Sequence, residues 1–325
     1  MNFKWLDFKI TKNCNNHCTY CGVDHTPPGS PEFLSDDDIV RTINAAIDQN
    51  FSHIALLGGE PSIRENIPLI FPRLQDAPEL TLLLITNGLV FHENMYRAAF
   101  NSKIGTVKVI FSFDSFVKPN NKHQDPSFTL KSINRIRRMA MEYSGEQLNR
   151  SIEVHSVISR ENYQKIIPHV DYFQSKNIEL SMALVCPSSF SEKIDTSKYN
   201  QFSFEDLDEI LKQLRELKKR RILNFGHQVL LDYLEQYPYG TLSMASDCNA
   251  GINHVVINFD GEVYPCVTES YRQGIRFGNI RVDPFPEIME KMSEFQCRSE
   301  FAPACWDHYL WNRLEDEIER EGAWE

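Results

Sequence analysis

The sequence predicts an α/β protein built on a partial, TIM-like (β/α)6 barrel, followed by a small α+β domain. The first observation is a series of six short apolar runs, most of them rich in β-branched or aromatic residues, as buried parallel strands are. The second is that amphipathic segments alternate with these runs, since serial β-α units form parallel sheets with right-handed crossovers. The third is a change of pattern after about residue 225, where the alternation ends and cysteines gather.

The elements of the barrel can be placed in order along the chain. The predicted strands occupy residues 6–10, 54–57, 80–85, 107–113, 152–158 and 178–185. The predicted helices occupy residues 36–49, 67–74, 92–99, 128–141, 162–174 and 204–220. Ser35 precedes three aspartates, a favourable helix start because a serine can cap backbone N–H groups and acidic residues complement the helix dipole.

The C-terminal part has a different organisation. Apolar runs at 255–259 and 262–266 flank Asp260-Gly261, a dipeptide that favours a tight hairpin turn. Segments 284–292 and 306–320 have helical patterns. We therefore predict two domains, a barrel over residues 1–225 and a small cysteine-rich unit over residues 226–325.

Composition excludes several classes of protein. Hydrophobic residues make up 42% of the 325 residues, enough for a full core, and the net charge of −11 disfavours binding to nucleic acid or to an anionic membrane. No apolar run reaches membrane-spanning length, and the N-terminal segment lacks the apolar stretch of a secretory signal. We expect a cytoplasmic protein, in which the eight cysteines are more often metal ligands than disulfides.

Cys14, Cys18 and Cys21 form a C-x3-C-x2-C loop just after the first predicted strand. Three thiolates on a cubane iron–sulfur cluster leave one iron open to an outside ligand, which makes the cluster reactive rather than structural. Structural zinc is the alternative. It usually takes four ligands, so His17 or His25 would have to complete the site.

Other unusual residues fall where predicted strands end, which is where sites form in parallel α/β folds. They are Gly58, Gly59, Glu60, Pro61, Asn87, Ser112, Asp114 and Cys186. Glu153 and His155 share one face of the fifth strand by alternation, pointing either into the barrel or toward a covering helix.

The cysteine loop, with Tyr20 before its last cysteine, and the Gly-Gly-Glu-Pro run at 58–61 together resemble the radical S-adenosylmethionine (SAM) enzymes. The resemblance implies a 4Fe-4S cluster on the three cysteines, whose open iron chelates SAM, and one-electron cleavage to a 5′-deoxyadenosyl radical. It also implies a group of SAM-binding residues: Tyr20, Gly58, Gly59, Glu60, Pro61, Asn87 and Ser112. The family often shows Ser-x-Asp-Gly after the fourth strand, whereas this chain has Ser115 in place of the glycine and no arginine over residues 118–126. Which cation would meet the SAM carboxylate therefore stays open.

Four cysteines of the C-terminal unit resemble those of the auxiliary-cluster domain called SPASM, or of its shorter form, Twitch. They are Cys248, Cys266, Cys297 and Cys305. The resemblance implies a second 4Fe-4S cluster, and the small number of cysteines favours the shorter form. Structural zinc is again the alternative, because four thiolates satisfy either metal.

We therefore expect a radical SAM oxidoreductase or maturase that takes hydrogen from a small-molecule or peptide substrate, with net oxidation through the auxiliary cluster. The chemistry implies flavodoxin or ferredoxin as electron donor. Cys186 is the one cysteine left over, and as a hydrogen donor it would make the enzyme an epimerase instead. A non-catalytic, zinc-stabilised binding protein is the alternative of another class.

Overall fold

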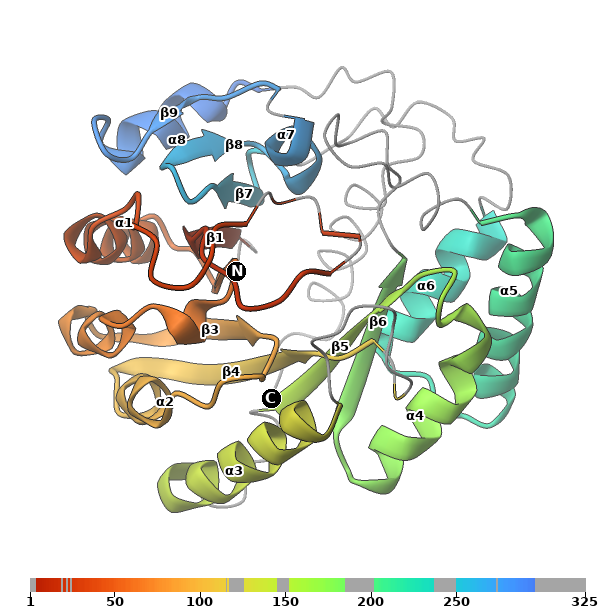
Figure 1. The fold of residues 1–325 in the computed structure, drawn as a ribbon. Coiled ribbons are helices and arrows are strands. Elements are labelled where there is room, and N and C mark those ends of the chain that lie inside the picture. The colour runs from red at the N-terminus through yellow and green to blue at the C-terminus, as the bar shows by residue number, and fades with distance from the viewer. Residues whose placement is uncertain are drawn as a thin grey trace.

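The computed structural model describes residues 4–18, 20–21, 23, 25–114, 116, 126–144, 152–184, 202–236, 250–272 and 274–295. Among these residues, nine strands form one curved sheet in the order β6-β5-β4-β3-β2-β1-β7-β8-β9 (Figure 1). The strands from β6 to β7 pair in parallel, and β7, β8 and β9 pair antiparallel. The described strands do not close into a complete barrel, which confirms the predicted partial barrel.

The strands are β1 (Trp5–Thr11), β2 (His53–Gly58), β3 (Ala77–Thr86), β4 (Ile104–Ser112), β5 (Ile152–Ile158), β6 (Glu179–Leu184), β7 (His254–Ile257), β8 (Glu262–Tyr264) and β9 (Gly278–Asn279). The helices are α1 (Asp36–Asp48), α2 (Glu93–Phe100), α3 (Pro126–Ser144), α4 (Ile166–Ser175), α5 (Phe204–Lys219), α6 (Phe225–Gln236), α7 (Val267–Arg272) and α8 (Phe285–Met292). Ser35 caps α1 as predicted, because its hydroxyl accepts from the backbone N–H of Asp38.

Helices α1 to α5 lie along the outer side of the curved sheet (Figure 1). Alternate residues of β1 illustrate how the two faces differ. Leu6, Phe8 and Ile10 are fully buried in the main core, whereas Asp7 and Lys9 fall on the inner face by alternation. The apolar outer face therefore packs the sheet against its helices, whereas the inner face carries polar side chains beside a small apolar cluster from β2, β3 and β4.

The helix predicted over residues 67–74 is wrong. The structure instead has three short 3-10 turns, Pro61–Ile63, Ile67–Leu69 and Phe71–Arg73. Each turn carries a proline at one of its first positions. Proline has no N–H to donate and clashes with the preceding turn, so an α-helical ladder cannot run through this segment.

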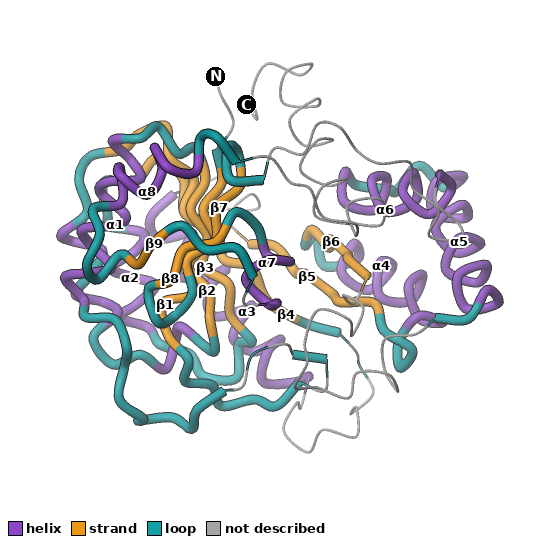
Figure 2. The backbone as a smooth tube through the Cα atoms, turned by 90° about the horizontal axis from the view of Figure 1, so that it is seen from above, coloured by secondary structure: helices purple, strands orange, loops and turns teal. Residues whose placement is uncertain are grey.

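The predicted hairpin at Asp260-Gly261 is confirmed by β7 and β8, and Gly261 has a positive φ of 89°. Less expected is that β7 pairs in parallel with β1, so the hairpin continues the barrel sheet, and α7 packs on β7 and β8 (Figure 2). The division at residue 225 stays a prediction. In the structure this point is the start of α6, which packs on α5 and β6.

None of the helices in the described part of the chain combines the length and apolar character needed to cross a membrane.

Candidate active site

The three N-terminal cysteines lie on the loop that leaves β1, as predicted. The backbone of the loop is fixed at its start, where Cys14 N–H donates to the carbonyl of Thr26 at 3.0 Å, and Cys21 N–H closes a turn within the loop by donating to the carbonyl of Cys18 at 3.1 Å. Cys14 is buried, and Cys18 and Cys21 are partly exposed. The loop therefore presents three thiols from one short segment at the carboxyl end of the sheet.

Gly58 and Gly59 dock this loop onto the end of β2. Gly59 N–H donates to the carbonyl of Thr11 at 2.8 Å, and Glu60 N–H donates to the carbonyl of Asn13 at 2.7 Å. A Cβ at Gly58 would lie 2.3 Å from the oxygen of Thr11, and one at Gly59 would lie 2.0 Å from the oxygen of Asn13. The close approach that the glycines permit is thus made to the cysteine loop itself.

Glu60 is buried beneath the loop, with 1% of its surface exposed. Its carboxylate accepts from the hydroxyl of Thr86 at 2.7 Å, from Asn87 N–H at 2.7 Å and from Ser62 N–H at 3.0 Å. Burial raises its pKa, and these donors oppose the rise. The described contacts make Glu60 a brace between the ends of β2 and β3, and its contact with SAM stays a prediction. Pro61, also buried, begins the 3-10 turn that follows.

Asn87 touches the loop from the end of β3. Its side-chain amide donates to the side-chain oxygen of Asn15 at 2.8 Å, and its own side-chain oxygen accepts from Leu89 N–H at 2.9 Å. Asn15 was missed by the sequence analysis, and only its place between two cysteines could have drawn attention to it. Asn87 thus positions the cysteine loop, in addition to any contact with SAM.

Tyr20 fastens the loop to the end of β4. Its hydroxyl donates to one carboxylate oxygen of Asp114, and the other oxygen accepts from Val157 N–H at 2.8 Å. Burial raises the pKa of Asp114 to about 6, and both hydrogen bonds oppose the rise. Ser112, the last residue of β4, is partly exposed and pairs in register with His155. The loop is therefore held by the carboxyl ends of β2, β3 and β4 together.

Polar groups contact all three sulfur atoms. Asn16 donates its backbone N–H to Cys14 Sγ at 3.4 Å and its side-chain amide to Cys18 Sγ at 3.3 Å, while His25 Nε2 lies 2.9 Å from Cys21 Sγ. Burial raises the pKa of Cys14 to about 11 and also raises the pKa of Cys18 and Cys21. The thiols therefore stay protonated until a metal displaces the protons.

Cys266 is buried directly before α7, and its Sγ accepts from Glu269 N–H at 3.4 Å. The remaining predicted cysteines, Cys186, Cys248, Cys297 and Cys305, lie outside the described residues. Within the described part, no group of three or more His, Cys, Asp or Glu side chains is arranged to hold a metal ion. A cubane cluster does not need such convergence, because each cysteine binds a different iron.

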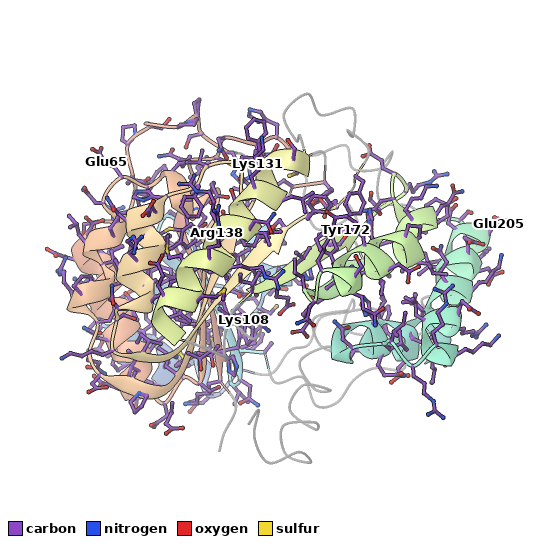
Figure 3. The ribbon with its side chains drawn as sticks, turned by 90° about the horizontal axis from the view of Figure 1, so that it is seen from below. Glu65, Lys108, Lys131, Arg138, Tyr172 and Glu205 are labelled. Carbon is purple, nitrogen blue, oxygen red and sulfur yellow. The ribbon has the colours of Figure 1, made fainter. Side chains whose placement is uncertain are left out.

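A network of polar side chains lies on the inner face of β4, β5 and β6. Lys108 Nζ lies 2.6 Å from a carboxylate oxygen of Glu153 and 3.7 Å from one of Glu179. The hydroxyl of Ser181 donates to the other oxygen of Glu153 and lies 2.9 Å from His155 Nδ1. Burial lowers the pKa of His155. Glu153 and His155 thus lie on the inner face together with Lys108, which resolves the alternative left open by strand alternation. Lys108 is labelled in Figure 3.

Ser156, the next residue of β5, is on the opposite face and is buried. His227 of α6, which the sequence analysis did not predict, is also buried, and neither ring nitrogen has a hydrogen-bond partner in the described part. Burial lowers the pKa of His227 to about 4, and nearby Glu153 opposes this shift.

Comparison with known proteins decides which family this arrangement belongs to. The model of the radical SAM superfamily matches residues 8–145, and the model of the SPASM iron–sulfur cluster-binding domain matches residues 248–307. The chain therefore carries a radical SAM domain followed by a SPASM domain. The first match contains the cysteine loop and its supports on β2, β3 and β4, and the second contains all four C-terminal cysteines.

Individual relatives of this chain are distant in sequence or match only part of it. The GTP 3′,8-cyclase of Desulforamulus reducens is 35% identical over 119 residues, which are 35% of each chain. The enzyme of the same name from Campylobacter jejuni is 21% identical over 311 residues, 89% of this chain and 90% of that one. The match thus spans about a third of the length of the more similar relative.

Solved structures share the fold. Streptococcus suis SuiB bound to its precursor peptide SuiA superposes with a TM-score of 0.66 at 15% identity, over 94% of this chain and 71% of that one. Native anSMEcpe with bound AdoMet gives 0.62 at 19% identity, over 97% and 96% of the two chains. These likenesses show that the chain shares the fold of these structures, and the SPASM match adds a C-terminal iron–sulfur cluster-binding domain.

The residues present fit an iron–sulfur cluster of this family. Three thiols come from one loop, and Asn16 supplies N–H groups of the kind that stabilise cluster sulfur. The glycine contacts at Gly58 and Gly59 explain why the loop can lie so close to the sheet. Cys14, Cys18 and Cys21 would hold the cluster.

Proposed function

We propose that this protein is a radical SAM oxidoreductase that reductively cleaves SAM at the cysteine loop and removes hydrogen from a polar substrate. The observation that carries the proposal is the cysteine loop, docked on three strand ends through Gly59, Asn87 and the Tyr20–Asp114 bond. When bound, the cluster and SAM would supply the electron and the 5′-deoxyadenosyl radical. The strand-end contacts hold the loop in one position, and Cys14, Cys18 and Cys21 would hold the cluster there.

The inner face of β4–β6 supports a polar substrate. Lys108 is the partner of two carboxylates, Glu153 and Glu179, so this group carries a net negative charge when His155 is neutral. Such a surface favours amine, amide or hydroxyl groups and repels a triphosphate. We therefore propose a small polar molecule or a peptide rather than the nucleotide triphosphate named for the cyclase relatives.

The C-terminal cysteines support net oxidation. We propose that Cys248, Cys266, Cys297 and Cys305 hold one auxiliary cluster, which would accept the electron left on the substrate after hydrogen removal. The SPASM match spans all four positions. A one-electron donor such as flavodoxin or ferredoxin would reduce the first cluster.

Anaerobic reconstitution tests the proposal. Two 4Fe-4S clusters correspond to about eight irons per chain, and dithionite with SAM should then release 5′-deoxyadenosine. Replacing Cys14, Cys18 and Cys21 by alanine should remove about half of the iron and abolish SAM cleavage. Protein that binds zinc instead, with no SAM cleavage after reconstitution, would contradict the proposal.

Whether the substrate is oxidised or inverted is tested by incubating the reconstituted enzyme with small polar metabolites and peptides and measuring the mass of the product. A loss of two hydrogens supports oxidation through the auxiliary cluster. An unchanged mass with inversion, lost in Cys186→Ala, would show that the enzyme is an epimerase.

A further inference from the structure

A buried arginine lies where both ends of the cysteine loop meet the segment that follows the Gly-Gly-Glu-Pro run. Arg64 directly follows the 3-10 turn Pro61–Ile63, and only 5% of its surface is exposed. Its Nη1 donates to the carbonyl of Ile10, in β1, and its Nη2 donates to the carbonyl of Leu34, before α1, both at 2.9 Å. One guanidinium therefore joins the chain before the cysteine loop to the chain after it.

Two carboxylates that follow the cysteine loop complete this contact. Asp36 Oδ1 accepts from Arg64 Nη2 at 2.6 Å and from Nε at 3.3 Å, and Glu32 Oε2 lies 3.4 Å from Arg64 Nη1. The other oxygen of Glu32 accepts from the hydroxyl of Thr11 at 2.9 Å and from the side-chain amide of Asn13 at 3.0 Å. Glu32 thus connects Arg64 to the residue that precedes the first cysteine.

The spacing of the three cysteines rests on contacts within the loop itself. Cys21 N–H donates to the carbonyl of Cys18, and Asn16 donates to the sulfur atoms of the cysteines on either side of it. Arg64 acts between segments, because it fixes the cysteine loop relative to the run at 58–61, whose contact with SAM is predicted. Loss of Arg64 should therefore disturb the relative position of the two segments more than the arrangement of the thiols.

We propose that Arg64 is a positioning residue that holds the cysteine loop and the run at 58–61 where both can reach one SAM molecule. A guanidinium suits this role, because its planar fork donates in several fixed directions at once. The inference rests on the proposed function in taking the two segments as the SAM site. Its consequence is a separation of two properties, since loss of Arg64 should weaken SAM binding and leave the first cluster in place.

The test is anaerobic calorimetry of SAM binding to the reconstituted holoprotein, with the clusters oxidised so that SAM is bound but not cleaved. Iron content is measured on the same samples, and it should fall by about half where the first cluster is lost. In Arg64→Met, we expect nearly the iron content of the wild type but a dissociation constant for SAM about tenfold higher.

Arg73→Met is the matched control, because Arg73 also pairs with a carboxylate of α1, that of Asp37, but its side chain is 45% exposed. Exposed ion pairs constrain the chain little, so this variant should bind SAM and iron like the wild type. Glu32→Ala is a second and milder variant, which removes the connection to Thr11 and Asn13 and should raise the dissociation constant about threefold.

The inference is overturned if Arg64→Met binds SAM as tightly as the wild type, or if Arg73→Met weakens binding equally. It is also overturned if Arg64→Met folds but loses the first cluster together with SAM binding, since Arg64 would then serve cluster assembly. If Arg64→Met does not fold, Glu32→Ala decides, and wild-type SAM affinity in that variant overturns the inference. A wild-type holoprotein that does not bind SAM would instead contradict the proposed function.

Discussion

The hydroxyl of Tyr20 donates a hydrogen bond to the carboxylate of Asp114, and this bond joins the cysteine loop to the end of β4. Tyr20 lies between two cysteines in the chain, so any shift of its ring moves the thiols with it. Asp114 is in turn fixed from β5, because Val157 N–H donates to its second oxygen at 2.8 Å. The position of the cysteine loop is therefore set by strands distant from it in sequence.

Removing the Tyr20 hydroxyl should loosen the loop. Tyr20→Phe leaves the buried Asp114 carboxylate short of a donor, which costs about 1–3 kcal/mol locally. We expect faster loss of iron from the first cluster and SAM cleavage slowed by about tenfold, if about 1.4 kcal/mol of this is felt at the site. Tyr172→Phe is the control, since Tyr172 lies on α4 within an aromatic group (labelled in Figure 3). Equal rates of iron loss and SAM cleavage in the two variants would show that the hydrogen bond of Tyr20 does not contribute to function.

Adding one methyl group at Gly59 should displace the cysteine loop. The new Cβ would lie 2.0 Å from the carbonyl oxygen of Asn13, which belongs to backbone that cannot swing away. We expect Gly59→Ala to bind much less iron at the first cluster after reconstitution, measured by iron content and absorbance. Gly29→Ala is the control, because its Cβ meets no atom within 4 Å and adds only the strain of a φ of 81°. A Gly59→Ala protein with full iron would contradict the docking role of this glycine.

A substitution can distinguish two roles of Glu60, a brace between the ends of β2 and β3 and a ligand of SAM. In Glu60→Gln, the side-chain NH2 group would face one of the groups that now donate to the carboxylate, so two donors would meet without an acceptor. This should lower the free energy of unfolding by about 1–3 kcal/mol. Urea unfolding of the anaerobic protein measures this change. The exposed Glu65, labelled in Figure 3, supplies the control Glu65→Gln, which should be near neutral. If Glu60→Gln weakens SAM binding with unchanged stability, Glu60 acts as a ligand rather than a brace.

His169 makes stability fall in mild acid. Burial lowers its pKa from 6.5 to about 4, so between these values the unfolded chain binds the proton and the folded chain does not. Stability is therefore lost as the pH falls from about 6.5 towards 4, by about 2 kcal/mol at pH 5. His169→Phe should remove this pH-dependent loss of stability, and a phenyl ring should fit because the imidazole packs against Phe113 and Phe116. Urea unfolding at pH 7 and pH 5 checks it, and an unchanged pH dependence in the variant would contradict it.

Local patterns predicted the elements well where a strand or helix depends on its own residues. The six barrel strands, the Ser35 cap and the hairpin at Asp260-Gly261 all follow from periodicity and turn chemistry within short windows. The segment 67–74 failed because apolar spacing was weighed above its two prolines, which break an α-helix into 3-10 turns.

The sequence by itself predicts the three cysteine ligands proposed for the first cluster and the strands that alternate with helices beneath them, because thiol spacing and side-chain periodicity are local properties. The contacts that hold this site in place are not local in the sequence. The pairing of β7 with β1, the reach of Tyr20 to Asp114 and the hydrogen bond of Arg64 to Ile10 each join residues far apart in sequence. Only packing in three dimensions could select them, since such contacts depend on which surfaces meet when the sheet curves.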